Sequence, residues 1–150
     1  MVLSYEMNSK MVDIYNRLPV EVGRIDPALQ KLAFSGFKEK DGCTFLTASL
    51  TTETNASIDM FPDRTGYECF INSINIDDFV KNNFLEQGIS FVQEVFSQWN
   101  KFKPPRKRIA LLIATEWGVK VKIHSHRQDE WWLADDLEGY EEPILVISSL

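Results

Sequence analysis

The sequence predicts an α+β protein, a single domain over residues 1–150, with a mostly antiparallel sheet, N-terminal helices and one long central helix. Residues 84–101 carry the strongest helical pattern, because apolar residues follow one another there at intervals of four, three, four and three. The segments before and after this helix are short runs of alternating or wholly apolar residues, separated by turn signals. A long helix between two groups of short strands is typical of an α+β fold.

The N-terminal part of the chain is predicted to be helical. Helical spacing relates five apolar or aromatic residues, namely Met7, Met11, Ile14, Tyr15 and Leu18. Pro19 ends this pattern, because proline cannot continue a helix. Asp26 and Pro27 predict the start of a second, short helix, since Asp caps free amides and Pro fits the first helical position. That helix is expected to stop near Gly36.

Strands are predicted between that helix and the long one. Asp41-Gly42 lies between two strand-like runs and predicts a type I′ hairpin. Residues 54–61 alternate between apolar and polar and predict a strand, which residues 63–66 would end as a turn. Residues 67–76 predict a further strand, although their alternation is poor, which suggests that both faces are covered.

The long helix and the final strands complete the prediction. Asp77 and Asp78 are expected to cap the next helical stretch, because carboxylates suit its free amides. Helix 84–101 ends before Pro104-Pro105. Strands are expected at 109–117, over VKVKIHSHR (119–127), at WWLA (131–134) and in the closing run ILVISSL. In the second of these, Val119, Val121, Ile123 and Ser125 form one face, and Lys120, Lys122, His124 and His126 form the other.

Composition limits the classes of partner. A net charge of −6 and an isoelectric point near 4.9 argue against DNA or an anionic membrane as the main partner and favour a basic one. No stretch approaches the roughly 20 apolar residues that a membrane span requires, and no signal peptide is recognisable. The two cysteines, Cys43 and Cys69, lack metal-type spacing and suit a reducing compartment. We therefore expect a cytoplasmic protein.

Catalytic and cofactor motifs do not emerge from the sequence. The nucleophile elbow, the Walker loop, the dinucleotide-binding glycine pattern and the zinc-protease motif are absent from it. His124 and His126 point the same way in a strand, which suits a metal, but Lys120 and Lys122 share their face and would repel a cation. We expect no enzyme, no cofactor and no metal. The alternative is a metal-dependent hydrolase that uses His124 and His126 with carboxylates brought in by the fold, such as Glu116 or Asp129.

Residues 101–108, KFKPPRKR, form a basic stretch. Its cations are Lys101, Lys103, Arg106, Lys107 and Arg108, which makes five in eight residues. Such a stretch can contact phosphate. It also suits the C-terminal end of a helix, where cations favour the dipole. The overall acidity of the chain favours the second interpretation.

Residues 128–142 combine acids with large aromatic residues. The segment holds seven acids and no base. In a strand, Trp131 would face the core with Leu133, and Trp132 would share the exposed face with Glu130. An indole among carboxylates suits an interface with a basic partner. The predicted partner-binding residues are Asp129, Glu130, Trp132, Asp135, Asp136, Glu138, Tyr140, Glu141 and Glu142. The alternative is that both indoles are buried and the acids are only solvated.

The whole chain resembles, in size, acidity and absence of catalytic motifs, the immunity proteins that neutralise bacterial polymorphic toxins, including those of contact-dependent growth inhibition. The resemblance implies a cytoplasmic inhibitor that binds a cognate toxin domain, often a nuclease, whose active cleft is basic because it must hold nucleic acid. The acidic aromatic segment would occupy or flank that cleft. An adaptor module in a larger assembly is a further alternative.

Overall fold

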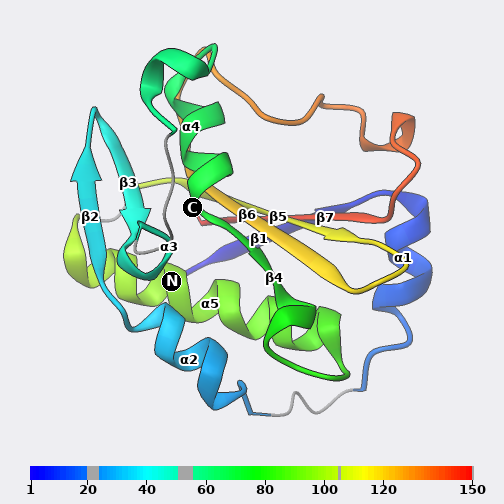
Figure 1. The fold of residues 1–150 in the computed structure, drawn as a ribbon. Helices are drawn as coiled ribbons and strands as arrows, with labels where there is room; N and C mark the ends of the chain where they lie inside the picture. The colour runs from blue at the N-terminus through cyan, green and yellow to red at the C-terminus, as the bar shows by residue number, and fades with distance from the viewer. Residues whose placement is uncertain (20–23, 51–55, 105, 150) are drawn as a thin grey trace.

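The computed structural model describes residues 1–19, 24–50, 56–104 and 106–149 (Figure 1). Five antiparallel strands form the main sheet in the order β1-β7-β5-β6-β4. Their bounds are β1 Leu3–Met7, β7 Ile144–Ser149, β5 Arg108–Ala114, β6 Val119–Ser125 and β4 Ser73–Asn75. A separate hairpin pairs β2 (Phe37–Lys40) with β3 (Cys43–Leu46). The predicted α+β class with an antiparallel sheet and a long central helix is confirmed.

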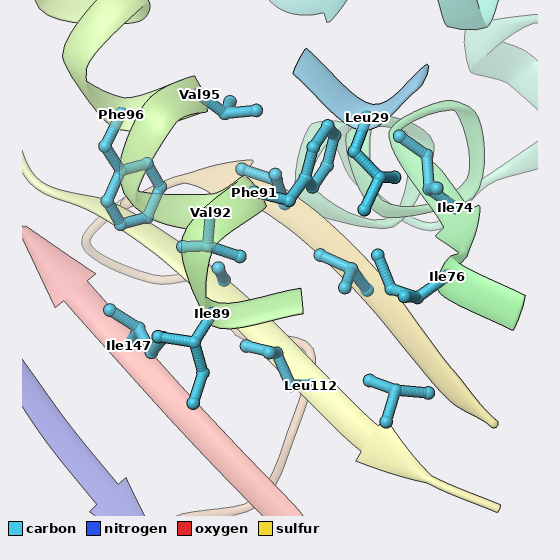
Figure 2. Close-up of a cluster of buried hydrophobic side chains, with 14 of the residues drawn as sticks. Leu29, Ile74, Ile76, Ile89, Phe91, Val92, Val95, Phe96, Leu112 and Ile147 are labelled. Carbon is cyan, nitrogen blue, oxygen red and sulfur yellow. The ribbon is translucent and has the colours of Figure 1, made fainter. Parts of the chain in front are cut away.

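Helices α5 (Phe84–Phe102) and α2 (Pro27–Ala33) cover one face of this sheet (Figure 1). The apolar stripe of α5 points onto the strands, and Figure 2 shows Phe91, Val92 and Phe96 among side chains from the sheet and α2. Gly88 lets the helix approach closely, because a Cβ atom there would lie 3.2 Å from Leu112 Cδ2. Burial of this continuous apolar layer is the main stabilising term of the domain.

Helix α4 (Arg64–Ile71) packs on the opposite face, against β6 and β3. It forms a smaller core with the hairpin, in which the rings of Phe45 and Tyr67 meet edge to face with centroids 4.9 Å apart. The remaining helical elements are α1 Ser9–Tyr15, α3 Thr47–Leu50 and the 3-10 turns η1 Ile58–Met60, η2 Ile76–Asp78 and η3 Leu137–Gly139.

Several local predictions are confirmed. Helix α5 matches the predicted helix 84–101, and strands β5, β6 and β7 occupy the predicted C-terminal runs. Asp26 caps α2 by accepting a hydrogen bond from the Ala28 amide at 2.9 Å, with Pro27 at the first position. Asp41 and Gly42 both take positive φ, 54° and 77°, as the type I′ turn requires.

The prediction of a strand over residues 67–76 is confirmed only for Ser73–Asn75, which form β4, and is wrong for Tyr67–Ile71, which belong to helix α4. The carboxylate of Asp63 accepts from the Gly66 amide and starts the helix inside residues 63–66, which were predicted as a turn. The apolar pattern of α4 is obscured in the sequence because the acidic Glu68 is buried while the apolar Phe70 is exposed. Of the strand predicted at 54–61, residues 54 and 55 lie outside the described residues, and Ile58–Met60 form η1.

Two predictions about helix starts are also wrong. The predicted N-terminal helical pattern starts at Met7, but this residue ends β1 beside β7, and the helix runs only over Ser9–Tyr15. Asp77 and Asp78 lie in η2 rather than at the start of α5. The residue before α5 is Asn83, which takes a left-handed conformation with φ of 56°.

Within the described part of the chain, no helix combines the length and apolarity needed to cross a membrane.

We predict that Phe96→Asp prevents folding. Phe96 is fully buried, so loss of its packing costs about 3–5 kcal/mol, and a buried carboxylate without a partner adds to that cost. Thermal melting by circular dichroism measures the effect. The matched control is Gln93→Asp on the exposed side of the same helix, which is expected to melt within a few degrees of the wild type. A cooperative wild-type transition in the Phe96 variant would contradict the packing of α5.

Candidate functional site

Residues 128–142 form an arch above the sheet face that α5 does not cover. The chain leaves β6, crosses over the sheet as an extended trace with one short turn, η3, and descends into β7 (Figure 1). We call residues 128–142 the acidic arch. Between this arch and the sheet lies a hollow of about 730 Å³.

The strand register defines the floor of the hollow. Two rows of side chains cross the sheet beneath the arch: Glu6, Val146, Leu111 and Lys122, and then Ser4, Ser148, Ile109 and His124. The middle of the floor is apolar, because Ile109, Leu111 and Val146 line the hollow there. The arch contributes Trp131, Trp132, Leu133, Ala134 and Leu137 to the walls.

A buried carboxylate anchors the first end of the arch. Glu68 of α4 has no exposed surface. Its Oε2 accepts from the Thr44 amide at 2.7 Å, and its Oε1 accepts from the Ser125 amide at 2.7 Å. Arg127 donates from Nη1 to Oε1 at 2.9 Å, and its Nη2 forms an ion pair with Oε2 at 2.9 Å. One side chain therefore joins α4, β3, β6 and the start of the arch.

Arg127 and Glu130 extend this anchor. Arg127 also donates to the Thr65 hydroxyl at 3.2 Å and to the Gly42 carbonyl at 3.3 Å. Glu130 accepts from the Thr65 amide at 3.0 Å. Burial alone would raise the pKa of the Glu130 carboxyl, but hydrogen bonds from Thr65 and the charge of Arg127 together hold this pKa below its usual value. Glu130 is thus ionised and bound to α4.

Asn8, at the end of β1, anchors the second end of the arch. This side chain is 2% exposed and donates to the carbonyls of Glu142, at 2.8 Å, and Leu137, at 3.2 Å. Its Oδ1 accepts from the Ile144 amide at 3.0 Å and from the Met11 amide at 3.1 Å, which also caps α1. The Ser9 amide donates to Glu138, and Lys10 donates to the Glu141 carbonyl.

Both indoles of the arch are exposed. Trp131 is 70% exposed and Trp132 is 41% exposed. The expectation that Trp131 joins the core in a strand is therefore wrong; a short bridge between Arg127 and Glu130 is followed by irregular backbone. The Lys122 ammonium lies 5.4 Å from the centre of the Trp132 ring, a cation–π contact that orients this indole. Burial lowers the pKa of Lys122.

The predicted partner-binding residues divide into two groups. Some also support the arch itself: Glu130 and Glu138 as described, Asp136 by accepting from the Glu138 amide, and Tyr140 by accepting from the Ala134 amide at 2.9 Å. Within the described residues, no side-chain hydrogen bond or ion pair engages the carboxylates of the others, Asp129, Asp135, Glu141 and Glu142, and all four are exposed. Their carboxylates are therefore free to contact a partner.

The two histidines differ in environment. His124 is 2% exposed, and its Nδ1 lies 2.8 Å from the Ser125 carbonyl, whereas His126 is exposed. The expectation that His124 lies on a solvated face is wrong, because the arch and α4 cover this side of β6. Burial lowers the pKa of His124. Among the described residues, no group of three or more His, Cys, Asp or Glu side chains is placed to hold a metal ion.

The two cysteines are free thiols in buried positions. Burial raises the pKa of Cys43 to about 11 and that of Cys69 to about 12. A thiol that stays protonated at neutral pH is a poor nucleophile.

Sequence reasoning missed the three residues that hold the arch: Glu68, Arg127 and Asn8. Glu68 did carry a signal, because it is a single acid inside the mostly uncharged run YECFI. A carboxylate in such a run requires a buried partner. Its partner Arg127 lies 59 residues away along the chain, so the pair is recognisable only in three dimensions.

Comparison with known proteins adds a family. The family model described as "Uncharacterized protein PM0498 family" matches residues 6–150. The chain belongs to this family. Over 82 residues it is 34% identical to "Uncharacterized protein PM0498" of Pasteurella multocida strain Pm70, a match that covers 51% of the chain and 52% of the relative. The match thus spans about half the length of that relative. A search of solved structures found no match.

We predict that Glu68→Gln destabilises the fold by roughly 3–5 kcal/mol, because it leaves the charge of Arg127 without its partner in a buried site. Urea unfolding measures the free energy of unfolding. The matched control is Glu39→Gln, which breaks the exposed ion pair with Lys103 and is expected to cost less than about 1 kcal/mol. Equal costs for the two variants would contradict the anchoring role of Glu68.

We predict that His124 makes stability depend on pH. Its pKa is lowered in the folded state, so the unfolded state binds more protons as the pH falls. The free energy of unfolding is therefore unaffected by this group above the ordinary histidine pKa of about 6.5. It decreases as the pH falls from there towards the lowered pKa of the folded state. Urea unfolding at about pH 7.5 and about pH 5.5 is expected to show a smaller loss of stability in His124→Gln than in the wild type. The control His126→Gln is expected to lose as much stability as the wild type. A smaller loss in His126→Gln than in His124→Gln would refute the assignment of this pH dependence to His124.

Proposed function

We propose that this protein is an inhibitor of the immunity type, which binds a basic protein domain, in particular a toxin nuclease, through the acidic arch. The observation that carries the proposal is the pair of exposed indoles, Trp131 and Trp132. They lie on a segment that buried side chains hold at both ends. Exposed large aromatic residues on a surface are typical anchors of protein interfaces.

The contacts of the indoles support a binding interface rather than a poorly packed edge of the core. Lys122 orients the ring of Trp132, and Tyr140 braces the backbone between the indoles and η3. A side chain that is already ordered in the free protein loses less conformational entropy when it binds. The arch therefore offers ordered apolar area at a modest entropic cost.

The charge of the arch indicates the kind of partner. Residues 128–142 carry seven acids and no base, and four of these acids are exposed and take no part in the arch's side-chain hydrogen bonds. Carboxylates at the rim of an interface accelerate association with a basic surface and disfavour acidic ones. A nuclease presents such a basic surface, because its cleft must bind phosphates. The arch would exclude nucleic acid from that cleft by occupying it.

The site of action in this proposal is the cytoplasm, where the buried thiols of Cys43 and Cys69 remain reduced. In this proposal the protein acts by binding and carries out no reaction of its own.

The test uses the product of the gene that neighbours this chain's own gene as the binding partner, measured by biolayer interferometry. The double variant Trp131→Ala/Trp132→Ala is expected to lose roughly 2 kcal/mol of affinity, about 30-fold, mainly by faster dissociation. The matched control is Trp117→Ala, which removes a 79% exposed indole in the turn between β5 and β6 and is expected to change nothing. Wild-type affinity in the double variant would place the interface elsewhere. A neighbouring product that neither binds nor is toxic would contradict the inhibitor function.

We predict a different effect from the acids. Neutralising Asp129, Asp135 and Glu142 is expected to slow association several-fold at low salt, and the difference is expected to disappear at high salt, because screening acts over about 8–10 Å. The matched control neutralises three exposed acids outside the arch, Asp59, Asp78 and Glu116. Equal slowing by the two triple variants would show that only the total charge matters.

A further inference from the structure

A second cavity, of about 340 Å³, lies where the tip of the β2–β3 hairpin, the C-terminal end of α5 and the end of β6 meet. Four lysine or arginine residues line it, Lys40, Lys103, Arg106 and Arg127, together with His126. We call this cavity the basic cleft. Its residues come from three segments that lie far apart in the sequence, and two of its cations belong to the basic stretch 101–108.

The charge balance of the basic cleft is opposite to that of the chain. Its lining includes two carboxylates, Glu39 and Asp41, although the protein as a whole carries a net charge of −6. Glu39 is already paired with Lys103, and Arg127 is paired with Glu68. Within the described part of the chain, Lys40 and Arg106 have no carboxylate at ion-pair distance. These two cations are therefore available to a ligand.

A further positive charge lies behind the cleft wall. Arg108 has no exposed surface and lies over the ring of Trp99, 4.7 Å from its centre, while Trp99 itself lines the cleft. Its guanidinium donates to the Asn100 side chain and to the Pro104 carbonyl, and its Nε has no hydrogen-bond partner among the described atoms. No described carboxylate pairs with it. Arg108 thus offsets the negative end of the α5 dipole, which would otherwise oppose an anion here.

The backbone around the cleft is tied together. The His126 amide donates to the Lys107 carbonyl at 2.9 Å. The Ser149 hydroxyl accepts from the Arg108 amide at 2.8 Å and donates to the Arg106 carbonyl at 3.2 Å. These bonds hold the segments that carry Arg106 and His126 against the ends of the strands. The hydroxyl residues Thr44 and Ser125 also line the cleft and add neutral donors.

We propose that the basic cleft binds a small anion of the phosphate type with two or more negative charges, held by Lys40 and Arg106 with His126 and the hydroxyl groups beside them. A cation would be repelled by the unpaired charges of Lys40 and Arg106, and an apolar ligand would leave these two side chains desolvated without partners. Charge-assisted hydrogen bonds to a multivalent oxyanion satisfy them instead. This proposal does not rest on the proposed inhibitor function, because its ligand differs and its two main cations, Lys40 and Arg106, do not line the hollow beneath the arch.

The experiment titrates the full chain with pyrophosphate at constant ionic strength and follows the backbone amides of Thr44, Ser125 and His126 by NMR. Saturable shifts of these amides are expected in the wild type. Lys40→Gln/Arg106→Gln is expected to weaken binding by roughly tenfold or more, because it removes two charge-assisted contacts. Both side chains are exposed, so the fold is expected to survive, and the two single variants are measured alongside to allow for a misfolded double variant.

The matched control is Lys38→Gln/Lys101→Gln, which removes one exposed cation from the strand that carries Lys40 and one from the last turn of α5, both outside the cleft. Binding within about twofold of the wild type in this control, with loss in the cleft variants, supports the proposal. Equal weakening in both pairs would show a diffuse electrostatic effect and overturn it. The absence of saturable shifts in the wild type would overturn it as well.

Discussion

The buried carboxylate of Glu68 is the interaction on which this architecture depends. An ionised carboxylate without solvent is stable only when several donors surround it, and here two backbone amides and one guanidinium do so. The same bonds satisfy backbone amides of β3 and β6 that donate to Glu68 instead of to a neighbouring strand. Helix α4 must therefore lie over this end of the sheet, with the hairpin on one side and the start of the acidic arch on the other.

The arch inherits its order from this arrangement. Arg127 fixes its beginning and Asn8 fixes its end, so a segment with little regular secondary structure has a defined path over the sheet. The hollow beneath it has an apolar middle, where Ile109, Leu111 and Val146 of the sheet line its floor. An ordered loop with exposed aromatic side chains, supported by a rigid sheet, is an arrangement in which binding surfaces are commonly built.

Acidic and basic side chains gather in separate regions of this protein. The protein has a net charge of −6, but its charges are unevenly distributed. All charged residues of the arch are acidic, whereas cations outnumber carboxylates in the basic cleft. The two regions meet at Arg127 and His126, which line both the hollow and the basic cleft. A uniform acidic surface would only keep the protein soluble and repel acidic molecules, whereas two opposed regions can recognise ligands of opposite charge separately.

The sequence by itself determined the elements whose signals are local. The stripe of α5, the Asp26 cap and the Asp41-Gly42 turn each depend on neighbours within a few residues, so their patterns were decisive. It also singled out residues 128–142 as the candidate binding segment. Tertiary structure decided what depends on distant partners. Helix α4 resembled a strand because its acid Glu68 is buried and its apolar Phe70 is exposed, and β1 is a strand because it pairs with β7, the last strand in the described part of the chain. Trp131 faces solvent because Arg127 and Asn8 hold the arch away from the sheet, and Glu68 could be buried only because the fold delivers a cation to it from 59 residues away.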